Sequence, residues 1–355
     1  MMCRRARWAA LLTVVATCGL AGTAHADPPG PTDYRSRVES MAPSVVGVSA
    51  RIIGGDSFFQ LTLDPSANVD ELVVVGYRGE PYLRFLRGGE VDENQRSPSR
   101  FLNLSRYGTA TEPAGADPAA APVWRAVAHD GRWAWHDHRT HWMNTVHPPG
   151  RHPGDQILEA VIPLVVDGDP VAVTVTSTWM PAPSGLPAVL GAVVGLTFGI
   201  GALAVARGRA RRDSATASNP LGHAAPAAAL FAAAAIALVV GLWQTWSVPA
   251  QTGPPVTAWA LPLTALVVAA GGLARRWSTF TVHAIAIVGA AQLVLWAVLR
   301  REGLVRAILP TNAPFWFDRA TSAGTGVAAA VVGAGALIAL GRMLIRPVGQ
   351  PSASM

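Results

Sequence analysis

The stretch Val171-Ala-Val-Thr-Val-Thr-Ser-Thr-Trp-Met-Pro-Ala-Pro-Ser-Gly-Leu-Pro-Ala-Val-Leu190 contains a change from one fold class to another. In its first part, valines alternate with smaller or polar residues, which is the period of a strand with one buried face. After a short Pro-rich linker, an apolar run begins at Leu186 and continues for about 20 residues, the length of a helix that crosses a bilayer. The chain is therefore predicted to be an all-β domain followed by transmembrane helices.

Residues 27–180 are predicted to form the all-β domain. Short apolar runs in this region are separated by turns rich in Gly and Asp, at 54–56, 88–89, 130–131 and 167–168. Because Gly and Asp accept the positive φ of tight hairpin turns, the pattern predicts antiparallel hairpins. With about nine strands, an immunoglobulin-like β-sandwich is the expected fold class.

Five apolar segments follow a linker at 181–187 and make up a membrane region at 188–345. Each is close to the length of about 20 residues that spans a bilayer, and they lie at about 186–206, 224–243, 257–274, 281–299 and 323–341. Gly191, Gly195 and Gly199 recur every four residues in the first segment. This spacing predicts close packing against a neighbouring helix.

The first 26 residues have the features of a secretory signal peptide. Three arginines precede an apolar run, and Ala24-His-Ala26 forms a small-x-small cleavage site before Asp27. Both cysteines of the chain, Cys3 and Cys18, lie in this segment. The mature chain is therefore expected to have no thiol for a disulfide, a nucleophile or a metal site.

The distribution of charge predicts the orientation in the cell membrane. Residues 27–185 contain 13 Arg and 19 Asp and Glu, whereas the chain from 186 onward contains 12 Arg and 3 acidic residues. Eight of these later arginines fall in the expected inner loops, so the β domain should be extracytoplasmic and the tail at 346–355 cytoplasmic. Four arginines in the expected outer loops are exceptions to this rule: Arg300, Arg301, Arg306 and Arg319. The segment 303–317 is expected to lie at the interface as an amphipathic or re-entrant piece. An acidic soluble domain argues against a nucleic-acid partner.

The chemically densest stretch is Trp133-Ala-Trp-His-Asp-His-Arg-Thr-His-Trp-Met143. Imidazole suits copper, and cuprous copper also accepts thioether sulfur, so the candidate copper ligands are His136, His138, His141 and Met143. A two-residue hairpin turn at Arg139-Thr140 would place all four donors on one face. Arg-Thr is a poor hairpin dipeptide, and a longer irregular loop is the alternative.

The same stretch also has a structural interpretation. Its tryptophans would be core or surface aromatics whose indole N–H groups are hydrogen-bonded. Asp137 would pair with Arg139, and the histidines would belong to a polar network.

Two other groups of polar residues are notable. Glu80 and Arg84 lie among aromatic residues, where a strand–turn–strand with paired charges is expected. His283 and Gln292 lie in the fourth apolar segment, where polar groups are costly. A role for His283 toward an ion or cofactor is the functional interpretation.

Three motifs carry resemblances to two families. Gly79-Glu-Pro-Tyr-Leu83 and Trp135-His-Asp-His-Arg-Thr-His-Trp-Met143, in this domain order, resemble an uncharacterised family of actinobacterial membrane proteins, which implies no assigned activity. Asp167-Gly-Asp-Pro-Val171 is similar to the Asp-Gly-His-Pro-Val hairpin of periplasmic copper-resistance β-sandwich proteins. That resemblance implies a sandwich fold. Asp169 stands where that family has His, and Asp27 begins the expected mature chain in place of His, so the family's copper ligands do not carry over.

The sequence contains no Gly-x-Ser-x-Gly, P-loop, dinucleotide fingerprint or zinc-binding His-Glu-x-x-His. The expected function is a non-enzymatic binding or assembly protein anchored in the lipid bilayer, with copper handling at the cell surface as the sharpest hypothesis. The alternative is a metal-independent scaffold that contacts an envelope or membrane protein partner through a Trp-rich surface. A transporter component is disfavoured, because the apolar segments carry few polar residues.

Overall fold

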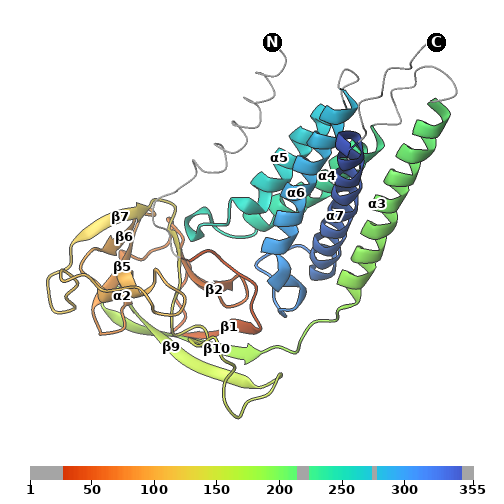
Figure 1. Cartoon of the computed structure of the whole chain (residues 1–355). Helices are drawn as coiled ribbons and strands as arrows, with labels where there is room; N and C mark the ends of the chain where they lie inside the picture. Colours follow the sequence, from red (N-terminus) through yellow and green to blue (C-terminus); the bar gives the residue numbers. More distant parts are fainter. Residues whose placement is uncertain (1–26, 214–223, 274–277, 346–355) are drawn as a thin grey trace, which may run out of the picture.

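The computed structural model describes residues 27–213, 224–273 and 278–345. The predicted signal peptide and C-terminal tail lie outside the described residues. Within the described part, ten strands precede a bundle of helices (Figure 1). The prediction of a β-rich region followed by apolar helices is confirmed.

The strands form two antiparallel sheets. One has seven strands in the order β1-β10-β9-β4-β5-β6-β7, and the other has three in the order β2-β3-β8. The bounds are β1 (Tyr34–Ala42), β2 (Val48–Ile53), β3 (Phe58–Leu63), β4 (Glu71–Val75), β5 (Pro81–Leu86), β6 (Val91–Asn94), β7 (Trp124–Ala128), β8 (Arg132–Trp135), β9 (Gln156–Val166) and β10 (Asp169–Trp179). A short helix, α2 (Pro98–Leu102), follows β6. The immunoglobulin-like strand order is not confirmed, because the strands divide seven and three.

Three of the predicted hairpin turns are present. Gly54 and Gly55 join β2 to β3, Gly88 and Gly89 join β5 to β6, and Asp167 and Gly168 join β9 to β10, with φ angles of 51° at Asp167 and 93° at Gly168. The turn at 130–131 has a different role. β7 pairs with β6 and β8 pairs with β3, so the chain crosses there from one sheet to the other.

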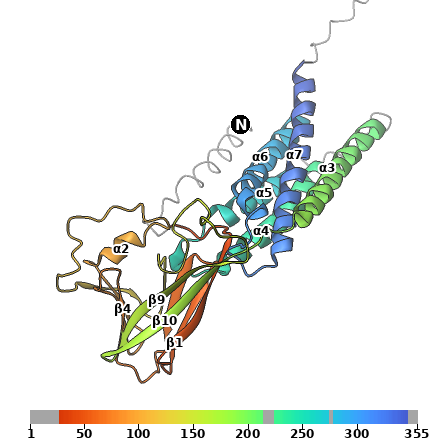
Figure 2. The same cartoon turned by 90° about the horizontal axis from the view of Figure 1, so that it is seen from below.

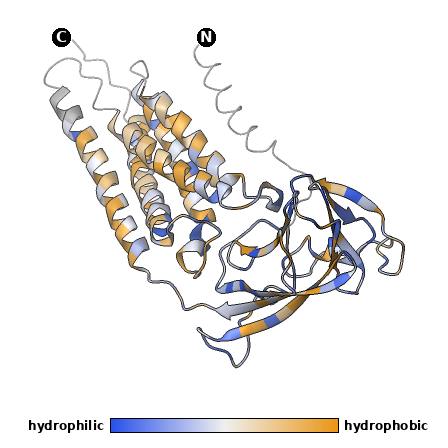
Figure 3. Ribbon diagram, turned by 180° about the vertical axis from the view of Figure 1, so that it is seen from behind, coloured by the Kyte–Doolittle hydropathy of each residue, from blue (hydrophilic) through white to orange (hydrophobic). Residues whose placement is uncertain are grey.

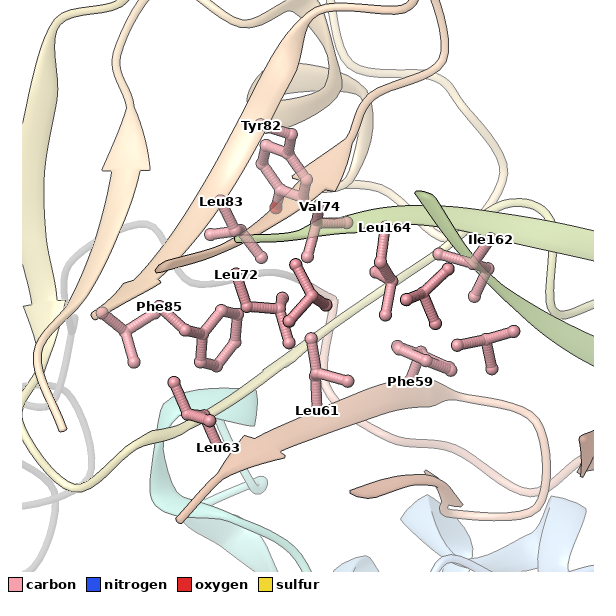
Figure 4. Packing of buried hydrophobic residues seen from close by; sticks show 14 of the residues in the cluster. Phe59, Leu61, Leu63, Leu72, Val74, Tyr82, Leu83, Phe85, Ile162 and Leu164 are labelled. Carbon is pink, nitrogen blue, oxygen red and sulfur yellow. The ribbon is translucent and has the colours of Figure 1, made fainter. Parts of the chain in front are cut away.

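The apolar core of the β region lies between the two sheets (Figure 4). Phe59, Leu61 and Leu63 of β3 face buried residues of the large sheet, such as Leu72 and Leu164. Each large apolar side chain that is fully buried contributes about 1.5–3 kcal/mol. Because side chains alternate along a strand, this packing turns the other face of β3 away from the core.

Five helices follow the β region, with bounds α3 (Leu186–Asp213), α4 (Ala225–Trp246), α5 (Thr257–Gly272), α6 (Thr279–Leu299) and α7 (Phe315–Ile345). Four of them, α3, α4, α6 and α7, are long and apolar enough to cross a membrane, and α5 is a shorter apolar helix of 16 residues. Figure 3 shows hydrophobic residues along the helices. The helices are therefore compatible with a multi-pass membrane protein.

The β region lies at one end of the helical bundle (Figures 1 and 2). Asp33 forms an ion pair with Arg306 at 2.6 Å and accepts a hydrogen bond from the backbone N–H of Ala307 at 3.1 Å. Thr32 and Ile308 form an isolated β-bridge. The segment 303–317 is the one expected to be amphipathic or re-entrant. Its first residues end the short helix η2 (Arg301–Leu304), and its residues Ala307 and Ile308 then pair with the β region.

The outer arginines predicted as exceptions to the charge rule have structural partners. Arg300 pairs with Asp318 and Arg306 with Asp33. Arg319 is buried and donates to backbone carbonyls of the η2 region, those of Gly303, Arg306 and Ala307. Asp318 and Arg319 lie in the first turns of α7, which begins at residue 315 and not at the predicted 323.

The three regularly spaced glycines of α3 lie where this helix contacts α7. A side chain at Gly191 would collide with the backbone of Ala320 in α7, and one at Gly195 would collide with the backbone of Gly324. Gly199 faces Val331 and Ala328 of the same helix. Only glycine allows the two backbones to approach this closely, so the predicted packing face is confirmed.

We expect the variant Gly195→Ala to destabilise the bundle. The added methyl group meets backbone atoms of Gly324 that have no room to move, and such overpacking costs about 1–3 kcal/mol. The thermal unfolding midpoint of the purified full chain measures the loss. Gly201→Ala is the matched control, because a methyl group at Gly201 of α3 meets open space. Equal midpoints for the two variants would contradict the packing.

Candidate functional site

The His/Trp/Met stretch begins in β8 and continues as an irregular loop. β8 ends at Trp135, and the residues that follow form no strand. The backbone N–H of Thr140 donates to the carbonyl of Asp137 at 2.9 Å, which closes a turn over 137–140. The two-residue hairpin considered for Arg139-Thr140 is therefore absent, and the longer loop is the correct alternative.

Asp137 holds this loop together from a buried position. Its carboxylate accepts hydrogen bonds from Arg139 at 2.7 and 2.8 Å and from the indole Nε1–H of Trp135 at 3.0 Å. Burial raises the pKa of Asp137, but the guanidinium of Arg139 outweighs it, and the net pKa is lowered. The predicted pairing of Asp137 with Arg139 is confirmed.

Two of the three tryptophans of the stretch lie in or against the core. Trp135 is buried, and Trp133 packs against the same apolar cluster. The indole of Trp142 is half-buried and donates to the carbonyl of Val146 at 2.7 Å. Among the described residues of the β region, Trp124, Trp133, Trp142 and Trp179 are partly exposed, and contact with a partner through a Trp-rich surface stays a prediction.

His136 is occupied by backbone carbonyls on both sides of its ring. Its Nδ1 lies 2.5 Å from the carbonyl oxygen of Ser57, and its Nε2 lies 2.7 Å from that of Asp27. The ring also stacks on Phe58, with centroids 4.1 Å apart. Both nitrogens face carbonyl oxygens, so a metal could reach the ring only by displacing one of these carbonyls. Its role here is to join the start of the described chain to β3.

His138, His141 and Met143 lie together. The rings of His138 and His141 have centroids 5.8 Å apart, and a side chain at Gly108 would touch both the His138 ring and the Met143 methyl group. Nε2 of His138 donates to the carbonyl of Ser105 at 2.8 Å, which leaves Nδ1 as the unprotonated nitrogen. Three of the four predicted donors are thus neighbours, and the ring centroid of His136 lies 6.4 Å from that of His141.

His141 has an unpartnered nitrogen. Its Nδ1 lies 3.2 Å from the carbonyl oxygen of Trp142, whereas Nε2 is buried and has no hydrogen-bond partner within the described chain. Burial lowers the pKa of His141 to about 3, with a further contribution from the Arg106 guanidinium. The ring is therefore neutral at physiological pH. Burial also lowers the pKa values of His136 and His138.

A conventional metal centre is not present in the described residues. They contain no group of three or more His, Cys, Asp or Glu side chains placed to hold a metal. The two histidines and the thioether form a smaller and softer donor set.

Glu80 is a structural anchor. Its buried carboxylate accepts hydrogen bonds from the hydroxyls of Ser97 and Ser99, both at 2.7 Å. Burial raises its pKa, but these hydrogen bonds outweigh burial and the net pKa is lowered. The predicted pairing of Glu80 with Arg84 is wrong, because Arg84 pairs with Asp92 across the sheet at 2.6 Å. The serines that hold Glu80 are not evident from the sequence.

The polar residues of the fourth apolar segment lie in α6. His283 hydrogen-bonds the carbonyl of Thr279 at 2.7 Å and lines a cavity of about 420 Å³, together with Arg207 and Arg342. Gln292 has a buried side-chain oxygen without a partner in the described chain. The suggested role of His283 toward an ion or cofactor stays a prediction.

A second candidate site lies where the β region meets the bundle. A polar cavity of about 600 Å³ separates the outer face of the three-stranded sheet from the α4–α5 and α6–α7 connections. Its charged lining residues are Arg35 of β1, Arg51 of β2, Arg132 of β8 and Asp130. We call this space the junction cavity.

Pairing between strands brings two of these arginines together. Arg51 lies opposite Gln60 in the register, and Arg132 lies opposite Thr62, two residues further along the same face of β3. On that face, Ile53, Phe58 and Ala134 pack against Val248 of the α4–α5 connection. Sequence reasoning missed this site, because its members are spread along the chain from Arg35 to Phe315 and no local pattern joins them.

Comparisons of the chain with protein-family models, with curated proteins and with solved structures find no match.

We expect His141 to make the folded chain less stable as the medium is acidified. The folded pKa of about 3 lies below the ordinary value of 6.5. Between these values the unfolded chain binds a proton that the folded chain does not, so stability falls as pH falls, by up to about 1.4 kcal/mol per pH unit. Chemical unfolding of the full chain at pH 7, 6 and 5 measures this slope.

His141→Gln should have a shallower slope than the parent. His152→Gln is the matched control, because His152 is exposed. A slope in His141→Gln that equals those of the parent and the control would contradict the buried, neutral state of His141.

Proposed function

We propose that this chain is a membrane-anchored extracytoplasmic binding and assembly protein that acts without catalysis. In this proposal the β region lies outside the cytoplasm, α3 to α7 form a five-span anchor, and the C-terminus is cytoplasmic. The observation that carries the proposal is the junction cavity, which is open, polar and lined by charged side chains. An assembly of β region and bundle that encloses such a space is suited to holding a ligand at the membrane surface.

The contacts around the junction cavity support a fixed binding geometry. The β-bridge between Thr32 and Ile308 and the ion pair between Asp33 and Arg306 join the two parts on one side. The apolar contact of Val248 with the three-stranded sheet joins them through the α4–α5 connection. Both walls of the cavity are therefore attached to each other, and a ligand would not have to bring them together.

The state of the buried polar groups supports a non-catalytic role. Asp137 is neutralised by Arg139, Glu80 accepts four hydrogen bonds, and His136 is held between two carbonyls. A general acid or base needs a proton that can move to or from a substrate. These groups are instead engaged in joining segments of the β region.

Cysteine labelling in intact cells tests both the orientation and the binding role. Residues 27–355 contain no Cys, so single engineered cysteines can be placed at will. An impermeant maleimide should label Ser44→Cys, which is exposed on the β region, and should not label Ser214→Cys, which follows α3. Gln251→Cys lines the junction cavity and should react more slowly in native membranes than in delipidated protein, because a bound ligand shields it.

The Ser44→Cys rate provides the control for reagent access, and it should be the same in both preparations. Labelling of Ser214→Cys in preference to Ser44→Cys would overturn the orientation. A Gln251→Cys rate that does not change on delipidation would overturn the occupied junction cavity.

Cuprous copper handling is the second candidate function. It is favoured by the buried and unpartnered Nε2 of His141, with His138 and Met143 beside it. Two imidazole nitrogens and a thioether are ligands that Cu(I) accepts. His136, the fourth predicted ligand, would have to leave its two carbonyl partners to take part.

We expect the full chain to bind one Cu(I) at this set if the second function is correct. Competition with a chromophoric Cu(I) chelator under reducing conditions measures the affinity. Met143→Leu keeps the apolar volume and removes the sulfur, and His138→Gln removes an imidazole donor, so each should weaken binding by at least about tenfold. Met180→Leu and His152→Gln are the matched controls. The site would be excluded if the parent did not bind Cu(I). It would also be excluded if the site variants and the control variants changed the affinity equally.

A further inference from the structure

The junction cavity has an excess of positive charge. Its charged lining consists of three arginines and one aspartate, a formal charge of +2. Among the described residues, none of the three arginines has a carboxylate within ion-pair distance. Asp130 accepts a hydrogen bond from the backbone N–H of Arg132 at 3.2 Å. The β region as a whole is acidic, with 19 acidic residues and 13 arginines in 27–185, so the cavity departs from its surroundings.

The arginines retain donors for a ligand. Arg51 donates from Nε to the side chain of Gln60 at 2.6 Å, which orients the guanidinium and leaves its two terminal nitrogens available. The side chains of Arg35 and Arg132 make no hydrogen bond within the described part of the chain. A planar guanidinium binds phosphate through two parallel hydrogen bonds, and several such groups match the several oxygens of one phosphate.

The opposite wall of the junction cavity is polar and belongs to the helix connections. Ser247, Gln251, Thr311 and Asn312 line it, and the hydroxyl of Ser247 accepts a hydrogen bond from the backbone of Asn312 at 2.9 Å. Hydroxyl and amide groups suit the glycerol or sugar part of a phosphate ester, which has no charge of its own. The two walls thus offer charged donors on one side and neutral polar groups on the other.

Exposed tryptophans lie at the helix ends around the junction cavity. Trp246 at the end of α4 lines the cavity and is 76% exposed, and Trp316 at the start of α7 is 61% exposed. Exposed Trp at helix ends is typical of the interface between lipid headgroups and water. A phosphate group of the membrane and one dissolved in water can both reach this depth.

We infer that the junction cavity binds a phosphate-bearing anion through Arg35, Arg51 and Arg132. The inference rests on the proposed binding function and gives its ligand a chemical class. An anionic lipid headgroup and a soluble phosphate ester share this chemistry, and the two sources differ in their need for a bilayer.

Native mass spectrometry of the full chain in detergent tests the inference with two probes. One is phosphatidylglycerol in mixed micelles, and the other is soluble glycerol phosphate. Arg51→Gln/Arg132→Gln removes two guanidinium groups and should weaken binding of the active probe by at least about tenfold, because charge-assisted hydrogen bonds are the strong ones. Arg37→Gln/Arg151→Gln is the matched control, since both of its arginines are exposed, lie outside the cavity lining and carry the same total charge.

Each outcome has a meaning. Retention of phosphatidylglycerol alone, lost in the cavity variant and kept in the control, assigns a lipid headgroup. Retention of glycerol phosphate with the same variant pattern assigns a soluble phosphate ester. Equal binding by the two double variants, or no binding of either probe by the parent, would overturn the inference. In that case, shielding of Gln251→Cys in native membranes would show that the binding function stands with a ligand of another class.

Discussion

The contact between the three-stranded sheet and the α4–α5 connection of the bundle is the constraint on which the rest of the structure depends. The ion pair of Asp33 with Arg306 is partly exposed, and such pairs contribute at most about 1 kcal/mol. The apolar cluster of Ile53, Phe58, Ala134 and Val248 is buried, and each large side chain there contributes about 1.5–3 kcal/mol. The cluster therefore provides most of the stability of the contact, whereas the ion pair and the β-bridge set its orientation.

The parts of the fold that were predictable are local. The alternation in β10, the turns at 54–55 and 167–168 and the glycine spacing of α3 each depend on residues a few positions apart, and all are present. The order of strands was not predictable, because it depends on which distant segments share a sheet. The turn at 130–131 shows the difference: its dipeptide is typical of a hairpin, yet the chain uses it to cross between sheets. The short α5 shows the same limit, since composition alone does not fix whether 16 residues complete a span.

The two sites were predictable to different degrees. The density of the stretch at 133–143 identified the side chains of the histidine loop, and three of its four candidate donors are neighbours. The partners of these side chains could not be predicted. They are the backbone carbonyls of Asp27, Ser57 and Ser105, and no sequence pattern indicates that these lie beside the histidines. The junction cavity had no local signal at all. Arg51 and Arg132 become neighbours only because β2 and β8 flank β3, and this pairing is a property of the fold.

Arginine has one role in the fold and another in the junction cavity. The chain has no Lys, and its 28 basic residues are all Arg, whose fork of donors can satisfy several acceptors at once. At the end of the bundle that meets the β region, Arg319 donates to three backbone carbonyls and Arg306 joins the two parts of the molecule. These arginines therefore have a structural role. Within the part of the chain that the structure describes, the arginines of the junction cavity have no such carboxylate or carbonyl partners, although acidic residues are abundant in the same domain. Because a cluster of like charges is unfavourable unless something neutralises it, a bound anion gives this arrangement a physical reason.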